Sequence, residues 1–397
     1  MLNYLTPNFT FAPILPEYGL GSRIWDVHGQ EFIDMAGGIA VNALGHCHPV
    51  LVEALTVQAK KLWHVSNIYT TEPAQALAQR LVENSFAQQV FFCNSGAEAN
   101  EAAFKLARKY ARDHFGKESG KNEIVACVNS FHGRTLFTVA VGGQPKYSQD
   151  FAPLPEGISH IPFNDVAALE ATVTDKTCAV VIEPIQGESG VLPATEAFLQ
   201  AARKICDKSQ SLLIFDEVQT GIGRTGSLFA HSRYNVIPDI LSSAKALGCG
   251  IPIGAMLTTS KVGASFTPGS HGSTFGGNPL ACAVGCAAFD IINSSETLNH
   301  VLSQGEKLKS ELIRIGRAFD VFVEVRGQGL LLGCVLSDQY SGRAKELMQL
   351  ALQQGLMVLI AGSNVIRLAP SLLLSNEDME EALLRLQSAI KCFVNVS

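Results

Sequence analysis

The chain has 397 residues, of which 47% are hydrophobic, and 36 acidic against 30 basic residues give a formal net charge of −6. This length is enough for two packed domains with a sizeable core. The basic residues form no cluster, which argues against nucleic acid and membranes as partners and favours small molecules. The ten cysteines include no CxxC pair, as expected for reduced thiols in a cytoplasmic protein.

The predicted elements begin with short strands in a segment rich in Pro and Gly, residues 1–48. Within it, Asp26-Val27-His28-Gly29 has the pattern of a turn that closes a hairpin. From 49 to 285, helical stretches alternate with short apolar runs, which favours a mostly parallel sheet with helices on both faces. Helices are expected at 49–62, 73–85 and 97–114, and strands at 90–93, 123–128, 179–182 and 212–215.

Beyond about residue 286 the pattern changes to long amphipathic stretches. Helices are expected at 296–315, 342–354 and 376–394, with short strands at 321–325 and 364–368. This pattern is typical of a smaller α+β domain. We therefore expect an N-terminal arm with a small-domain segment (1–48), a large domain (49–285) and a C-terminal small domain (286–397).

Two titratable residues of the large domain follow apolar runs. Asp216 ends the run 212–215, and Lys245 comes soon after the run 237–241. A cofactor that withdraws electrons through a pyridine ring needs a lysine for its aldehyde and a carboxylate for its ring nitrogen. Taken alone, such a pair is more often a surface ion pair. Because glycine-rich turns, which let the backbone approach a ligand, follow both residues, the pair predicts pyridoxal 5'-phosphate.

Two segments offer donors to a phosphate group. Ser95-Gly96-Ala97 follows an expected strand and opens an expected helix, whose N-terminus attracts anions. Ser95 and Glu98 also have the spacing of a capping box, so a plain helix cap is the alternative. Ser273 and Thr274 lie among glycines, which suits phosphate contact and a tight turn equally.

Other polar and aromatic residues follow strands at the edge where ligands of α/β sheets bind. Phe131 could stack on a planar ring and Arg134 could pair with a carboxylate, although a core aromatic and a solvated ion pair are the more common roles. Glu188 follows another buried run, where a carboxylate needs an arginine partner. Arg367 is the candidate for that partner.

Two further patterns exclude other classes of site. The glycine-rich stretches do not have the GxGxxG spacing of a dinucleotide-binding fold. His46-Cys47-His48 is a poor metal site, because three adjacent residues of an extended chain cannot all point at one ion. No metal is expected.

Together these segments resemble the class III, or ω-amino, aminotransferases of the fold-type I pyridoxal-phosphate enzymes. The resemblance covers nearly the whole chain, and its motifs follow one another in family order. They are NSGAEANE at 94–101, FHGRT at 131–135, FDEVQTG at 215–221, AKAL at 244–247 and GSTFGGNP at 272–279. The resemblance implies an α/β fold, in which a large domain with a mostly parallel seven-stranded sheet is joined to a smaller α+β domain.

The resemblance also implies a role for each candidate residue. As catalytic residues, Lys245 binds the cofactor's aldehyde and moves a proton, and Asp216 pairs with the pyridine nitrogen. The other cofactor contacts come from Ser95, Gly96 and Ala97 at the phosphate, Phe131, Val218 and Gln219 around the ring, and Thr274 of the neighbouring subunit. Arg134 holds a substrate carboxylate with Ser273 nearby, and Glu188 alternately masks and exposes Arg367.

The implied reaction is a ping-pong transfer of the terminal amino group of N2-acetylornithine to 2-oxoglutarate, which gives glutamate and N-acetylglutamate 5-semialdehyde in arginine biosynthesis. The implied assembly is a homodimer with shared active sites. Succinylornithine, ornithine, 4-aminobutyrate and succinyl-diaminopimelate remain alternative substrates. Two other classes also stay open, namely an aminomutase of the same fold and a ligand-binding protein without catalysis.

Overall fold

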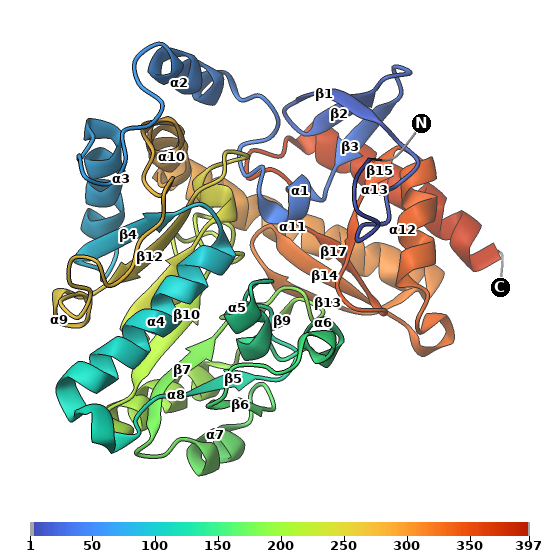
Figure 1. Ribbon diagram of the computed structural model, residues 1–397. Helices are drawn as coiled ribbons and strands as arrows, with labels where there is room; N and C mark the ends of the chain where they lie inside the picture. The colour runs from blue at the N-terminus through green and yellow to red at the C-terminus, as the bar shows by residue number, and fades with distance from the viewer. Residues whose placement is uncertain (1–3, 396–397) are drawn as a thin grey trace.

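A seven-stranded sheet forms the centre of the computed structural model, which describes residues 4–395 (Figure 1). The strand order is β4-β12-β11-β10-β7-β5-β6. The strands are β4 (Gln89–Cys93), β5 (Glu123–Cys127), β6 (Ile158–Ile161), β7 (Thr177–Ile182), β10 (Leu212–Asp216), β11 (Ile240–Ser243) and β12 (Gly254–Thr258). β12 runs antiparallel to the other six strands, which are parallel to one another. The predicted mostly parallel, seven-stranded sheet is confirmed.

Helices cover both faces of this sheet. On β10, Leu212 and Ile214 pack with α4 (Gly96–Phe115), whereas Leu213 and Phe215 pack with α8 (Glu196–Ser209). Successive side chains of a strand point to opposite faces, so an apolar run without alternation is buried on both sides. Figure 1 shows α4 crossing the near face of the sheet.

The remaining elements of the large sheet region are short, apart from three helices at the β4 edge. Those three are α2 (Pro49–Ala59), α3 (Glu72–Glu83) and α10 (Pro279–Ile292), and α10 packs against both α2 and α3. The short elements are α1 (Gly37–Ala40), α5 (Leu136–Val141), α6 (Pro145–Ser148), α7 (Val166–Thr172), α9 (Ser260–Gly263), β8 (Ile185–Gln186) and β9 (Leu192–Pro193). The expected helices at 49–62, 73–85 and 97–114 are confirmed with shifted ends, whereas β6 and β12 were not expected.

A second, antiparallel sheet lies in the C-terminal part, with the order β13-β14-β17-β16. Its strands are β13 (Phe322–Gln328), β14 (Leu331–Leu336), β16 (Leu359–Ile360) and β17 (Val365–Leu368). The expected helices here are present as α11 (Ser295–Phe319), α12 (Ala344–Gln353) and α13 (Asn376–Asn395). Among residues 4–395, no helix has the length and apolar character needed to cross a bilayer.

The N-terminal segment forms the predicted hairpin. Strands β1 (Pro16–Leu20), β2 (Arg23–Asp26) and β3 (Glu31–Asp34) are antiparallel, and the Asp26 carboxylate accepts from the backbone of the turn, at His28 and Gln30. β3 continues into a parallel pair with β15 (Leu356–Met357). Arg23 also binds Asp378 and Glu381 of α13, so the two ends of the chain are joined.

Candidate active site

A cavity of about 470 Å³ opens where the parallel strands end. Asp216 ends β10, Lys245 follows β11, Glu183 follows β7, and Phe131 follows β5, so the strand ends bring together residues far apart in sequence. Ligands of open α/β sheets bind at this edge. The predicted residues that line the cavity are Ser95, Gly96, Ala97, Phe131, Arg134, Glu188, Asp216, Val218, Gln219 and Lys245.

Asp216 is buried and held by three donors. Alternation along β10 turns it to the α4 face, where Asn100 Nδ2 donates to its Oδ2 at 2.7 Å. His132 Nδ1 lies 2.8 Å from the same oxygen, and the backbone N–H of Val218 donates to Oδ1 at 3.0 Å. His132 Nε2 is buried without a partner in the described chain, and a proton on Nδ1 lets His132 donate to Asp216.

Lys245 faces the cavity from a short turn after β11. Its backbone has φ 48°, a left-handed conformation that side-chain-bearing residues rarely adopt. Its Nζ makes no hydrogen bond or ion pair with any residue that the structure describes. Burial lowers the pKa of this amine, and Arg367 lowers it further against the opposing effect of the nearby carboxylates. Burial thus favours the neutral amine, the form that can attack a carbonyl carbon.

The N-terminus of α4 points its free N–H groups at the same cavity. Ser95 caps the helix as predicted, because its Oγ accepts from Glu98 N at 3.2 Å. The Glu98 carboxylate reaches back to Asn94 N at 2.6 Å, one residue before the position that a capping box would give. A Cβ on Gly96 would lie 2.7 Å from Val218 Cγ1, so glycine allows the helix start to approach Val218.

Phe131 and Arg134 form one wall of the cavity with Tyr147 behind them. The Arg134 guanidinium lies 3.7 Å from the Tyr147 ring centroid and 5.5 Å from that of Phe131. Arg134 is exposed, and it has no acidic partner or hydrogen bond within residues 4–395. An arginine that is held by rings and lacks an anion can receive a carboxylate.

Glu188 and Arg367 form the predicted ion pair, with Arg367 Nη1 donating to Glu188 Oε1 at 2.6 Å. Arg367 lies in β17, and its side chain is 2% exposed against 25% for Glu188. Burial raises the pKa of Glu188, but Arg367 and Lys245 outweigh burial, so the pKa lies below its usual value. Glu188 is therefore a stable anion beside Lys245.

Glu183 is a second buried carboxyl group of the cavity. Its Oε2 accepts from the backbone N–H of Phe131 at 3.1 Å. Burial, with Asp216 nearby, raises the pKa of Glu183 well above its usual value. Burial thus favours the neutral form of Glu183, which lies close to Asp216 and Glu188.

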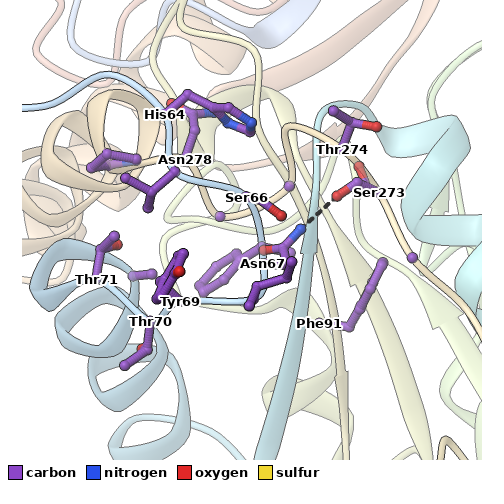
Figure 2. A pocket seen from close by; sticks show the side chains of 18 of the residues that line it. His64, Ser66, Asn67, Tyr69, Thr70, Thr71, Phe91, Ser273, Thr274 and Asn278 are labelled. Atoms are coloured by element: carbon purple, nitrogen blue, oxygen red, sulfur yellow. Dashed lines mark hydrogen bonds between the residues drawn. The ribbon is translucent and has the colours of Figure 1, made fainter. Parts of the chain in front are cut away.

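Ser273 and Thr274 do not line this cavity. They line another one, of about 560 Å³, together with residues 64–71 (Figure 2). Figure 2 shows Asn67 pointing to Ser273, whose carbonyl accepts from Asn67 Nδ2 at 2.6 Å. Asn94 Nδ2, from the first cavity, donates to Ser273 Oγ at 3.0 Å, so the two cavities are neighbours.

Sequence reasoning missed the partners of Asp216, which are Asn100 and His132. Asn100 is one helical turn beyond Gly96, and that spacing places both residues on the same face of α4. His132 lies between two predicted residues in the loop after β5. Either could have been found by asking which polar side chains share a face with a predicted site residue.

The residues present fit pyridoxal phosphate. Asp216 would face the ring nitrogen, the amine of Lys245 would meet the aldehyde, and the start of α4 would hold the phosphate. Phe131 and Val218 offer apolar surfaces for the ring. The Oδ1 of Asn100 is buried without a partner among the described residues. A buried polar atom usually has a hydrogen-bond partner, so this atom indicates that the site binds a polar group from outside the protein.

Comparison with known proteins gives the family. The model of the aminotransferase class-III family matches residues 6–390. A protein of Neisseria meningitidis serogroup B named acetylornithine aminotransferase is 68% identical, over 100% of this chain and 99% of the relative. A succinylornithine transaminase of Yersinia pseudotuberculosis is 56% identical, over 98% of this chain and 95% of its own length.

Among solved structures, the N-acetylornithine aminotransferase of Stenotrophomonas maltophilia is similar, with a TM-score of 0.86 and 44% identity over 97% of each chain. The family model matches residues 6–390, a range that contains all the residues that line the cavity. This chain belongs to the class III aminotransferases, enzymes that depend on pyridoxal phosphate.

Proposed function

We propose that this enzyme transfers the terminal amino group of N2-acetylornithine to 2-oxoglutarate. The reaction would serve arginine biosynthesis in the cytoplasm. The similarity to relatives named for acetylornithine carries the proposal. The difference between the two arginines supports the proposal, because Arg134 has no acidic partner among the described residues whereas Arg367 is paired with Glu188. Succinylornithine is the second candidate substrate, because a relative at 56% identity is named for it.

Two substrates with different demands must use one site. N2-acetylornithine reacts through its terminal amine and leaves one carboxylate for Arg134. Glutamate reacts through its α-amine, so one of its carboxylates lies close to the reacting carbon and needs a second cation. A movable Glu188 meets both demands, because it masks Arg367 for the first substrate and exposes it for the second.

Pyridoxal phosphate, when bound, supplies a protonated pyridine ring that stabilises negative charge on the substrate carbon. Asp216 would keep the ring nitrogen protonated, and Asn100 and His132 hold Asp216 in place. The amine of Lys245 takes the proton from the substrate carbon and returns it, since burial lowers its pKa and so favours the neutral form that can accept a proton.

A panel of half-reactions tests the substrate. The pyridoxal form is mixed separately with acetylornithine, succinylornithine, ornithine, 4-aminobutyrate, succinyl-diaminopimelate and glutamate, and the loss of visible absorbance is followed. Acetylornithine and glutamate should react fastest, and Lys245→Ala should abolish both reactions. A preference for succinylornithine would support the second candidate, and no reaction with glutamate would reject both.

We also propose that the enzyme is a homodimer with shared active sites. Ile68, Tyr69 and Phe275 are large apolar residues at or beside the second cavity, with exposed fractions of 83%, 69% and 59%. Such an apolar surface indicates an interface. A second copy seated there would bring its own phosphate site to Thr274, which lies outside the Lys245 cavity of its own chain.

Subunit mixing tests the shared site. Lys245→Ala and Thr274→Asp should each be inactive, but a mixed dimer has both changes in one site and an intact second site. Refolding the two variants together should therefore restore activity. Lys245→Ala mixed with Asp216→Asn is the control, because both residues belong to the same chain's site and no intact site can form. Equal recovery in the two mixtures, or none in either, would contradict sharing.

A further inference from the structure

The side-chain amide of Gln219 lies between Glu188 and Arg367. Its Nε2 donates to Glu188 Oε1 at 3.2 Å, and its Oε1 accepts from Arg367 Nη1 at 3.2 Å. Arg367 Nη1 also donates to Glu188 Oε1, at 2.6 Å. The three side chains thus close a ring of hydrogen bonds at the cavity wall.

The packing shows which member of the ring can move. Arg367 is buried, and its Nη1 is held additionally by the carbonyl of Gly187 at 2.9 Å. The Gln219 amide packs on the same glycine so closely that a Cβ there would lie 2.0 Å from its Oε1. Glu188 is the most exposed of the three and lines the cavity. Glu188 is therefore the part that can swing away.

When Glu188 leaves, two donors face the position that its carboxylate held, namely Arg367 Nη1 and Gln219 Nε2. An amide can accept from an arginine and donate to an anion at the same time, and it carries no charge of its own. A carboxylate at the same place would accept from Arg367 but could not donate, and it would repel any incoming anion.

We propose that Gln219 determines the specificity of the Glu188–Arg367 switch, because it presents a neutral donor to whichever carboxylate occupies Arg367. This inference rests on the proposed function, in which that carboxylate belongs alternately to Glu188 and to the substrate. Gln219 then does more than line the cofactor. Because the Gln219 amide is neutral, the substrate carboxylate can replace the Glu188 carboxylate at Arg367 without a change in the local charge.

The test compares two unreactive ligands on the holoenzyme by calorimetry. Glutarate has two carboxylates and can reach both Arg134 and Arg367, whereas pentanoate has the same length and a single carboxylate for Arg134. Gln219→Glu should weaken glutarate at least about tenfold, the effect of losing one charge-assisted hydrogen bond. Pentanoate should change by less than about threefold, and the glutamate half-reaction should slow more than that of acetylornithine.

Two further variants complete the experiment. Gln200→Glu, on the exposed face of α8, adds the same charge far from the switch and should leave both ligands unaffected. Gly187→Ala should displace the Gln219 amide without a change of charge, and it should also weaken glutarate binding selectively. This variant tests the inference if Gln219→Glu does not fold. Glutarate affinity that is unchanged, or that falls together with pentanoate affinity, would overturn the inference. If the wild-type enzyme fails to react with glutamate, the proposed function fails instead.

Discussion

Replacing Arg134 separates its role in binding from any role in stability. Its guanidinium stacks on Tyr147 at 3.7 Å and has no acidic partner among residues 4–395, so Arg134→Ala leaves no buried group unpaired. The cost to the fold is the stacking alone, about 1 kcal/mol. A bidentate pair with a substrate carboxylate contains two charge-assisted hydrogen bonds of about 1.5–3 kcal/mol each.

Because Arg134 is exposed, water competes for these bonds, and we expect a net loss of about 2–3 kcal/mol, or about 30- to 150-fold in kcat/KM. The loss should be similar for acetylornithine and glutamate, since both place a carboxylate there. Arg134→Lys keeps the charge without the planar fork and should lose about fivefold. Single-turnover half-reactions and the Tm of each variant provide the measurement. Unchanged kcat/KM in Arg134→Ala would refute the assigned role.

Two further predictions concern stability. Burial raises the pKa of Glu183 in the folded state, so between its unfolded and folded pKa values the folded protein binds more protons and stability falls as pH rises, by up to about 1.4 kcal/mol per pH unit. Glu183→Gln should flatten this pH dependence, as measured by urea unfolding of the cofactor-free protein. Parallel pH profiles of the variant and the wild type would contradict the raised pKa of Glu183. Arg23→Met should lower the free energy of unfolding by about 2 kcal/mol, because Asp378 loses its cation and Glu31 and Glu381 keep only Arg385, and the loss should shrink in high salt. A loss that is independent of salt would show that packing, not charge, explains the effect.

Much of the fold was predictable, because both periodicities of the chain are plain. The run Leu212 to Phe215 has no alternation and became a strand buried on both faces. Some strands, including β6, were missed, and two of the omissions have clear physical reasons. β12 begins at Gly254 in a glycine-rich stretch that favours a loop, and β14 is a short apolar run that periodicity cannot assign to a helix or a strand.

The residues of the cavity were predictable where each one follows its own strand. Asp216, Lys245 and Phe131 could be proposed in this way, because the ends of parallel strands meet at one edge. Asn100 and His132 do not follow from this rule, since their importance lies in a contact with Asp216 across the sequence, and only their positions beside predicted residues pointed to them. The separation of Thr274 from the cavity was likewise beyond local patterns, and the resemblance alone suggested that it serves a neighbouring subunit.

The two arginines of the site differ in the way that two-substrate specificity requires. Arg134 is exposed and, within the described part of the chain, is held only by aromatic rings, so an arriving carboxylate would displace water and break none of these protein contacts. Arg367 is buried and paired, so an arriving carboxylate must first displace Glu188. Under the proposed function, a ligand with one carboxylate would bind without opening the pair, whereas a ligand with two would compensate for the lost Glu188 contact. Discrimination then depends on the exchange at Arg367 rather than on the size of the cavity.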